Sequence, residues 1–405
     1  MNFTSDILDV AIKIENHKIE LQSSIENELI ARYVFRSKSK GSLLGKRIIA
    51  LTLLRYLIVD NLGAKCINVN YSLYEHEEKY ILGEVSRTQD HYRELNDIKI
   101  NFRSDLLKYD ADNLELNNKG CLLGFTGGKD STLCYELIKE KYDDLFKFKI
   151  DFDDEEFISD YHISRQVLNY DIFNLLSTES FIRNKNKHYY QEEDLHCCFA
   201  APYFNVSNNH PMYLCVGLQF DVVNYYVYEN DALISESCLT ETYSSIRIFE
   251  KLFIEYGLVK FRVVVPLASL SSFAIYGILL NKYGENTLRS MNSCWHSNNN
   301  SVLCGKCLKC QRVSYIYKII GMSLSNQERI SAELFEKSDT TIAELFGSKS
   351  CEQLTRIYKD EPFLLSNFVF SDDKITYLDH GLNAILSKQF NLETIENPLM
   401  KSNIK

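Results

Sequence analysis

A glycine-rich turn between two apolar segments constrains the fold of this chain more than any other feature. The run CLLGF (121–125) has the length and composition of a buried strand, TGGKDS (126–131) follows directly, and TLCYELIKEK (132–141) has helical spacing. Paired glycines allow a sharp turn and bring bare amides close to a ligand. A strand, a tight turn and a helix in this order predict one unit of an α/β fold.

The same turn has the chemistry of a phosphate site. We expect the helix to start near Asp130, where its unpaired amides and the positive end of its dipole attract anions. Lys129 adds a cation, and the hydroxyls of Thr126 and Ser131 add donors. Asp130 is then expected either to cap the helix or to bind Mg²⁺. The spacing is not that of a Walker loop. The alternative is a structural strand-to-helix turn with an aspartate cap.

Further strands and helices alternate along the chain. This pattern predicts an α/β protein with a mostly parallel sheet and helices on both faces, in which ligands bind at the carboxyl ends of the strands. Strands are expected at 147–153, 212–220 and 261–267, and helices around 43–61, 243–256 and 273–283.

Four of the twelve cysteines lie close together in the sequence, at Cys294, Cys304, Cys307 and Cys310. Two-residue gaps let successive thiolates converge on one ion, and Gly305 supplies a tight turn. Four soft ligands at this spacing suit tetrahedral Zn²⁺. A four-iron, four-sulfur cluster is the main alternative, because closely spaced cysteines also hold iron.

Composition excludes several classes of protein. The net charge of -10 argues against general affinity for nucleic acid. The first residues lack the pattern of a secretory signal, so the cysteines are expected to be reduced in the cytoplasm. The apolar stretch 47–62 contains two arginines, and the stretch 263–280 is divided by Pro266 and serines. Neither resembles a membrane span, and no membrane partner is expected.

The turn TGGKDS resembles the PP-loop, S-G-G-x-D-S, of the ATP pyrophosphatase superfamily, with Thr126 in place of serine. The order of motifs over residues 119–320 resembles the 7-cyano-7-deazaguanine synthase family, called QueC-like. The further motifs are VGLQFD (216–221), VVVPLASLS (263–271), and the cysteine cluster about 165 residues after the loop. The longer chain is similar to the QueC-like component of Qat anti-phage defence systems.

The resemblance implies an enzyme that splits ATP to AMP and pyrophosphate with Mg²⁺, activates the carboxylate of a deazaguanine, and carries a structural zinc. It assigns ATP binding to residues 125–132 and catalysis to Lys129, Asp130 and Ser131. Asp221 is the candidate for holding the heterocycle. The ATP-binding residues are Phe125, Thr126, Gly127, Gly128, Lys129, Asp130, Ser131 and Thr132.

Two departures from the family concern the substrate side. Residues 271–273 lack the lysine that synthases carry, and the passage after Asp221 matches only loosely. About 115 extra residues also precede the loop. We therefore predict transfer of the activated acyl group to an amine on a partner protein rather than on tRNA. The alternatives are a free nitrile synthase that uses ammonia, a PP-loop tRNA-modifying enzyme, or a nucleotide-binding scaffold.

The predicted organisation has three parts. Residues 1–115 form a mixed α/β extension that offers a partner or dimer surface, so a homo-oligomer is one outcome. Residues 116–325 form the PP-loop domain with the cysteine cluster, and residues 326–405 form a helical extension.

Overall fold

The computed structural model describes residues 7–91, 98–103, 116–152, 159–177, 195–218, 226–229, 232–235, 243–267, 272–291, 303–336, 368–371 and 374–377. The chain divides into two units, each built from several stretches of sequence. Unit 1 consists of Met1–Leu122, Phe148–Leu214 and Cys238–Arg262. Unit 2 consists of Leu123–Lys147, Cys215–Ser237 and Val263–Lys405.

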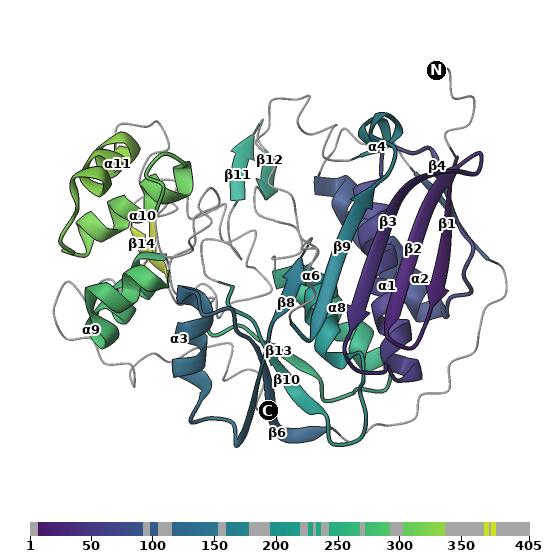
Figure 1. Cartoon of the computed structure of the whole chain (residues 1–405), viewed down its shortest axis with the longest axis horizontal. Helices are drawn as coiled ribbons and strands as arrows, with labels where there is room; N and C mark the ends of the chain where they lie inside the picture. Colours follow the sequence, from purple (N-terminus) through teal and green to yellow (C-terminus); the bar gives the residue numbers. More distant parts are fainter. Residues whose placement is uncertain are drawn as a thin grey trace. The chain divides into compact units, whose positions relative to one another are not determined.

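A seven-stranded mixed sheet forms the centre of unit 1 (Figure 1). Its strand order is β5-β4-β1-β2-β3-β9-β8, antiparallel from β1 through β2 and β3 to β9 and parallel elsewhere. Alternation along β1 buries Leu8 and Val10 on the helix side. The strands are β1 (Ile7–Ile14), β2 (Lys18–Ile25), β3 (Glu28–Ser37), β4 (Cys66–Val69), β5 (Lys99–Phe102), β8 (Ile150–Phe152) and β9 (Tyr161–Val167).

Helix α1 (Leu43–Asp60) packs against this sheet and is buried on most of its surface. The Ser42 side chain accepts a hydrogen bond from the Gly45 amide and so fixes the start of the helix. The remaining helices of unit 1 are α2 (Glu75–His91), α4 (Tyr170–Leu176), α6 (Leu195–Ala200), the 3-10 turn η1 (Ala201–Tyr203) and α8 (Tyr243–Glu255). Within the described residues, no helix combines the length and apolar character needed to cross a bilayer.

The core of unit 1 contains a compensated cluster of charges. Glu84 of α2 is fully buried, and its carboxylate accepts hydrogen bonds from Arg55 at 3.0 Å and from Arg87 at 3.0 and 3.1 Å. The His196 ring lies 3.9 Å from the same carboxylate and forms a 2.6 Å hydrogen bond with the Ser245 hydroxyl. Arg87 donates to that hydroxyl as well. The positive groups of this cluster therefore surround a carboxylate supplied by the chain itself.

A second, four-stranded sheet is mostly parallel, with the order β13-β10-β6-β7. It consists of β6 (Asn117–Gly124), β7 (Asp144–Phe148), β10 (Pro211–Cys215) and β13 (Arg262–Val264). The predicted α/β class is confirmed, but the larger sheet is mixed, which no pattern in the sequence indicated. The single strand predicted at 147–153 is also wrong: β7 and β8 are separate strands that join different sheets.

The described residues of unit 2 form the glycine-rich turn, most of β7, several helices and two hairpins. Its helices are α3 (Lys129–Ile138), α9 (Ser272–Ser290), α10 (Leu308–Ile319) and α11 (Asn326–Glu336). The hairpins pair β11 (Tyr226–Glu229) with β12 (Ala232–Ser235) and β14 (Phe368–Ser371) with β15 (Lys374–Tyr377). Helix α11 and the second hairpin are the described elements of the segment 326–405, for which a helical extension is predicted.

Strand pairing crosses the boundary predicted at residues 115 and 116. Strand β9 pairs with β3 along seven residue pairs, from Ala31–Val167 to Ser37–Tyr161. Residues before and after the glycine-rich turn therefore share one sheet in unit 1.

Candidate functional site

The glycine-rich turn lies between a strand and a helix, as its sequence predicts. Strand β6 ends at Gly124 and α3 begins at Lys129. Gly127 has a φ of +78°, a left-handed conformation that side-chain-bearing residues rarely adopt. Gly128 is the N-cap of α3, and no side chain caps the helix there. The first amides of an α-helix have no acceptor within the helix, so this start is chemically suited to an anion.

The predicted catalytic side chains lie at this helix start. Lys129 Nζ is 2.6 Å from Asp130 Oδ1, and the two side chains are 14% and 36% exposed. The Ser131 hydroxyl donates to the Gly128 carbonyl at 3.1 Å. Thr126 is exposed in the turn, whereas Thr132 is almost buried and its amide donates to the same carbonyl. Lys129, Asp130 and Thr126 are therefore the side chains accessible to a ligand.

The side chain of Phe125 packs against α3. Its ring packs edge-on against the Tyr135 ring at 6.1 Å between centroids. The Lys147 ammonium lies 4.1 Å from the Phe125 ring and 3.7 Å from the Tyr135 ring. These cation–π contacts hold the side chain of Phe125 against α3, and its predicted contact with ATP stays a prediction.

Helix α9 supplies a buried tyrosine beside the turn. The ring of Tyr276 lies 5.4 Å from Lys129 Nζ, and Tyr276 is only 2% exposed. Burial, followed by the neighbouring Tyr317 and Asp130, raises the pKa of Tyr276 well above its usual value. Tyr276 is therefore a neutral group that packs against the lysine, and no local sequence pattern pointed to it.

Three of the four predicted metal ligands converge. The sulfur atoms of Cys304, Cys307 and Cys310 all lie within 4.8 Å of one another, close enough to hold one metal ion. Backbone amides donate to two of these sulfurs, Cys307 N to Cys304 at 3.5 Å and Cys310 N to Cys307 at 3.4 Å. Gly305, with a φ of +70°, makes the turn between the first two cysteines. Soft sulfur ligands in this arrangement are consistent with zinc.

Helix α11 supports the cysteine turn from outside. The side-chain amide of Gln327 donates to the Cys304 carbonyl at 2.8 Å, and the Ser331 hydroxyl donates to the Gly305 carbonyl at 2.8 Å. The backbone carbonyls of the turn are thus tied down by a neighbouring helix. Such supporting bonds fix the direction in which the ligand atoms point.

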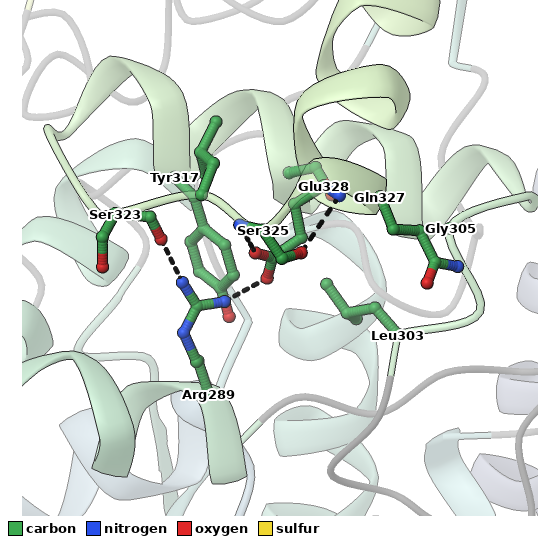
Figure 2. Close-up of a pocket in the computed structure, with 10 residues that line it drawn as sticks. Arg289, Leu303, Gly305, Tyr317, Ser323, Ser325, Gln327 and Glu328 are labelled. Carbon is green, nitrogen blue, oxygen red and sulfur yellow. Dashed lines mark hydrogen bonds and ion pairs between the residues drawn. The ribbon is translucent and has the colours of Figure 1, made fainter.

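A cavity of about 500 Å³ lies between α9, α10 and α11, next to the cysteine turn (Figure 2). Arg289 reaches across it to Glu328 and to the Ser323 carbonyl, and Glu328 also accepts from the Ser325 amide at 2.8 Å. None of residues 125–132 lines the cavity. The charged groups that line the cavity, Arg289 and Glu328, pair with each other across it. The cavity is therefore a separate feature from the glycine-rich turn.

Several predicted residues lie outside the part of the chain that the structure describes. These are Cys294, Asp221 and Ser271, and the side chains of Ser272 and Phe273 at the start of α9. Their predicted roles stay predictions.

Comparisons with known proteins do not identify the chain. No family model matches it, and no curated protein matches its sequence significantly. A functional proposal therefore rests on the glycine-rich turn, the cysteine turn and the resemblance of the motifs.

Proposed function

We propose that this chain is a QueC-like ATP pyrophosphatase that activates the carboxylate of a deazaguanine as an acyl adenylate. One observation carries the proposal: a positive-φ glycine turn leads into a helix start with no side-chain cap, next to Lys129. That arrangement concentrates amide donors, a helix dipole and a cation at one point. The motif resemblance supplies the reaction class.

A carboxylate is a poor electrophile, so the first step attaches AMP to it as a good leaving group. A carboxylate oxygen attacks the α-phosphorus of ATP, the bond from that phosphorus to the bridging oxygen of the β-phosphate breaks, and pyrophosphate leaves. Lys129 and the first amides of α3 would hold the leaving phosphates and neutralise their growing charge. Asp130 would hold Mg²⁺, which shields polyphosphate charge when it is bound.

The second step transfers the acyl group. An amine nitrogen attacks the activated carbonyl carbon. The bond from that carbon to the oxygen that bridges it to phosphorus breaks, and AMP leaves with this oxygen. The nitrogen then loses a proton, which gives the amide. The acceptor amine belongs to a partner protein in this proposal. A net charge of -10 disfavours tRNA, and ammonia would need none of the extra residues before the turn.

The activation step is tested by product analysis with ATP, Mg²⁺ and a deazaguanine carboxylate. We expect AMP and pyrophosphate. Asp130→Ala should abolish turnover, and so should Ser131→Ala, because the Ser131 hydroxyl holds the Gly128 carbonyl and with it the shape of the turn. Glu140→Ala, at an exposed position just beyond α3, should not. Release of ADP and phosphate would exclude a PP-loop reaction.

The acceptor is tested separately by mass spectrometry. A partner protein that gains the acyl mass only with ATP and an intact Asp130 supports transfer. Efficient release of free 7-cyano-7-deazaguanine with ammonium and no partner would instead identify a nitrile synthase.

We propose zinc as the ion at the cysteine turn, with Cys294 as the fourth ligand beside Cys304, Cys307 and Cys310. Elemental analysis should find one zinc per chain. A brown protein that contains iron would identify a cluster instead.

A further inference from the structure

Gly217 lies against the first turn of α3. It follows the last residue of β10, Cys215, by two positions, and β10 is the neighbour of β6, the strand that leads into the glycine-rich turn. The nearest atoms of α3 belong to Asp130 and Ser131. The backbone that leaves β10 therefore borders the helix start where the proposed catalytic side chains lie.

The contact between Gly217 and α3 leaves no room for a side chain. A Cβ atom built on Gly217 would lie 3.2 Å from the Cβ atom of Asp130, 3.5 Å from the carbonyl carbon of Asp130 and 3.6 Å from the Ser131 nitrogen. The first distance is below the optimum of about 3.5–4.0 Å for two carbon atoms. The φ of Gly217 is not positive, so the close approach, rather than the backbone conformation, calls for glycine here.

Both sides of this contact are held in place by the structure around them. On the strand side, the Val216 amide donates to the Val264 carbonyl at 3.0 Å, which ties this segment to the end of β13. On the helix side, the thiol of Cys134, a fully buried residue of α3, donates to the Val216 carbonyl at 3.8 Å. A side chain at position 217 would therefore push Asp130 aside by a few tenths of an ångström, because a packed interior yields little.

The atoms that such a side chain would displace are the ones that the proposed chemistry needs. Asp130 carries the carboxylate proposed to hold Mg²⁺, and it pairs with Lys129 at 2.6 Å. The Ser131 amide belongs to the first turn of α3, whose amides are proposed to hold phosphate. Groups of this kind act only when they lie within about 0.5 Å of the productive geometry.

We propose that Gly217 is a positioning residue of the ATP site, and that the lack of a side chain at this position sets the place of the Asp130 carboxylate and the Ser131 amide. Gly217 acts through Asp130 and needs no contact with the nucleotide. The inference rests on the proposed function and deepens it, because it gives the motif 216–221 a role in the geometry of the helix start.

The first experiment measures AMP formation by full-length Gly217→Ala at several Mg²⁺ concentrations, with ATP and a deazaguanine carboxylate. We expect kcat to fall by about tenfold, since a misplacement of about 1 Å costs about a hundredfold and this one is smaller. The Mg²⁺ concentration that gives half of the maximal rate should rise, whereas the KM for the deazaguanine carboxylate should stay the same. An unchanged kcat and an unchanged Mg²⁺ requirement would overturn the inference.

Gly120→Ala is the matched control, because it introduces similar crowding in the same sheet away from α3. A Cβ atom on Gly120 of β6 would lie 3.1 Å from the Cα atom of Pro211 in β10. Both variants should unfold at lower temperatures than the wild type, but only Gly217→Ala should change the Mg²⁺ requirement. The same change in Gly120→Ala would indicate a general effect of crowding in the sheet and would overturn the inference.

A stability measurement tests the contact without any turnover. Asp130→Gly removes the Cβ atom that lies nearest to position 217. Gly217→Ala should therefore lower the melting temperature less in the Asp130→Gly chain than in the wild type, since the two substitutions affect one contact. If Gly217→Ala alone does not fold, the double variant should recover folding. Equal losses in both backgrounds, or no recovery, would show that position 217 does not act through Asp130.

Failure of the inference and failure of the proposed function give different results. A wild-type chain that forms no AMP would refute the proposed function, while the melting temperatures still test the contact between Gly217 and Asp130. A wild-type chain that forms AMP, together with a Gly217→Ala variant that matches it, would refute the inference and leave the function in place.

Discussion

The two units of this protein place their charged side chains differently. In unit 1, Arg55 and Arg87 surround Glu84, which is fully buried and accepts hydrogen bonds from both. In unit 2, Lys129 pairs with Asp130 at the start of α3, and the two side chains are 14% and 36% exposed. The first arrangement is closed to solvent, whereas the second stays accessible to a ligand. The exposure of paired charges therefore distinguishes a structural cluster from a candidate binding site.

The cysteine turn extends this comparison to the proposed metal ion, and loss of that ion should have the largest effect on stability. Structural zinc contributes on the order of 10 kcal/mol to folding in small zinc domains. Cys307→Ser or chelation should therefore expose the amides of α10 and α11 to hydrogen exchange while α1 and α2 stay protected. Cys66→Ser, in β4 and outside the cluster, is the control. Equal protection of α10 with and without metal would contradict the prediction.

The next largest effect should come from breaking the compensated cluster. Glu84→Gln leaves the buried Arg55 and the half-buried Arg87 without their carboxylate, and breaking a buried pair costs about 3–5 kcal/mol. Denaturant unfolding measures this loss. Glu75→Gln removes a carboxylate that pairs with Lys79 on the exposed face of the same helix, where both side chains are more than 70% exposed. That control should leave the free energy of unfolding almost unchanged, because solvent screens an exposed ion pair. Similar losses of unfolding free energy in Glu84→Gln and Glu75→Gln would contradict the distinction between a buried and an exposed ion pair.

Acid should reduce the stability that the Glu84 cluster provides, by a somewhat smaller amount than Glu84→Gln does. Burial alone would raise the pKa of Glu84, but Arg55, His196 and Arg87 outweigh it and lower the pKa to about 2 from an ordinary value of 4.5. The folded pKa is below the unfolded one, so this stabilisation is present above about pH 4.5 and is lost as pH falls towards 2. It amounts to about 3 kcal/mol at most.

The measurement is the difference in unfolding free energy between the wild type and Glu84→Gln at several pH values. That difference should narrow as pH falls from about 5 towards 2. A difference that stays constant over this range would show that the carboxylate is not held ionised by its neighbours.

The turn and the cysteine cluster could be predicted because their chemistry is local in sequence. Gly127 and Gly128 stand between a strand and a helix, and Cys304, Cys307 and Cys310 follow the spacing that one ion requires. In contrast, Tyr276 has the spacing of an ordinary helix residue. Its placement beside Lys129 depends on tertiary packing of α9 against α3, which no local pattern encodes.

The same limit applies to the fold. Alternating strands and helices predicted the α/β class and the helix at 43–61, because hydrophobic periodicity is local. The pairing of β3 with β9 joins segments more than a hundred residues apart, and periodicity carries no information about partners. For that reason the mixed sheet and the separation of β7 from β8 could not be predicted.

That pairing has a practical consequence for anyone who wishes to shorten the protein. A truncated chain that starts at residue 116 would keep β9 but lose the seven partners that β3 provides. One side of β9 would then present a row of unsatisfied amides and carbonyls, the kind of edge along which proteins aggregate. The segment that resembles a shorter synthase is therefore not a separable module, and expression trials should retain the strands before the turn.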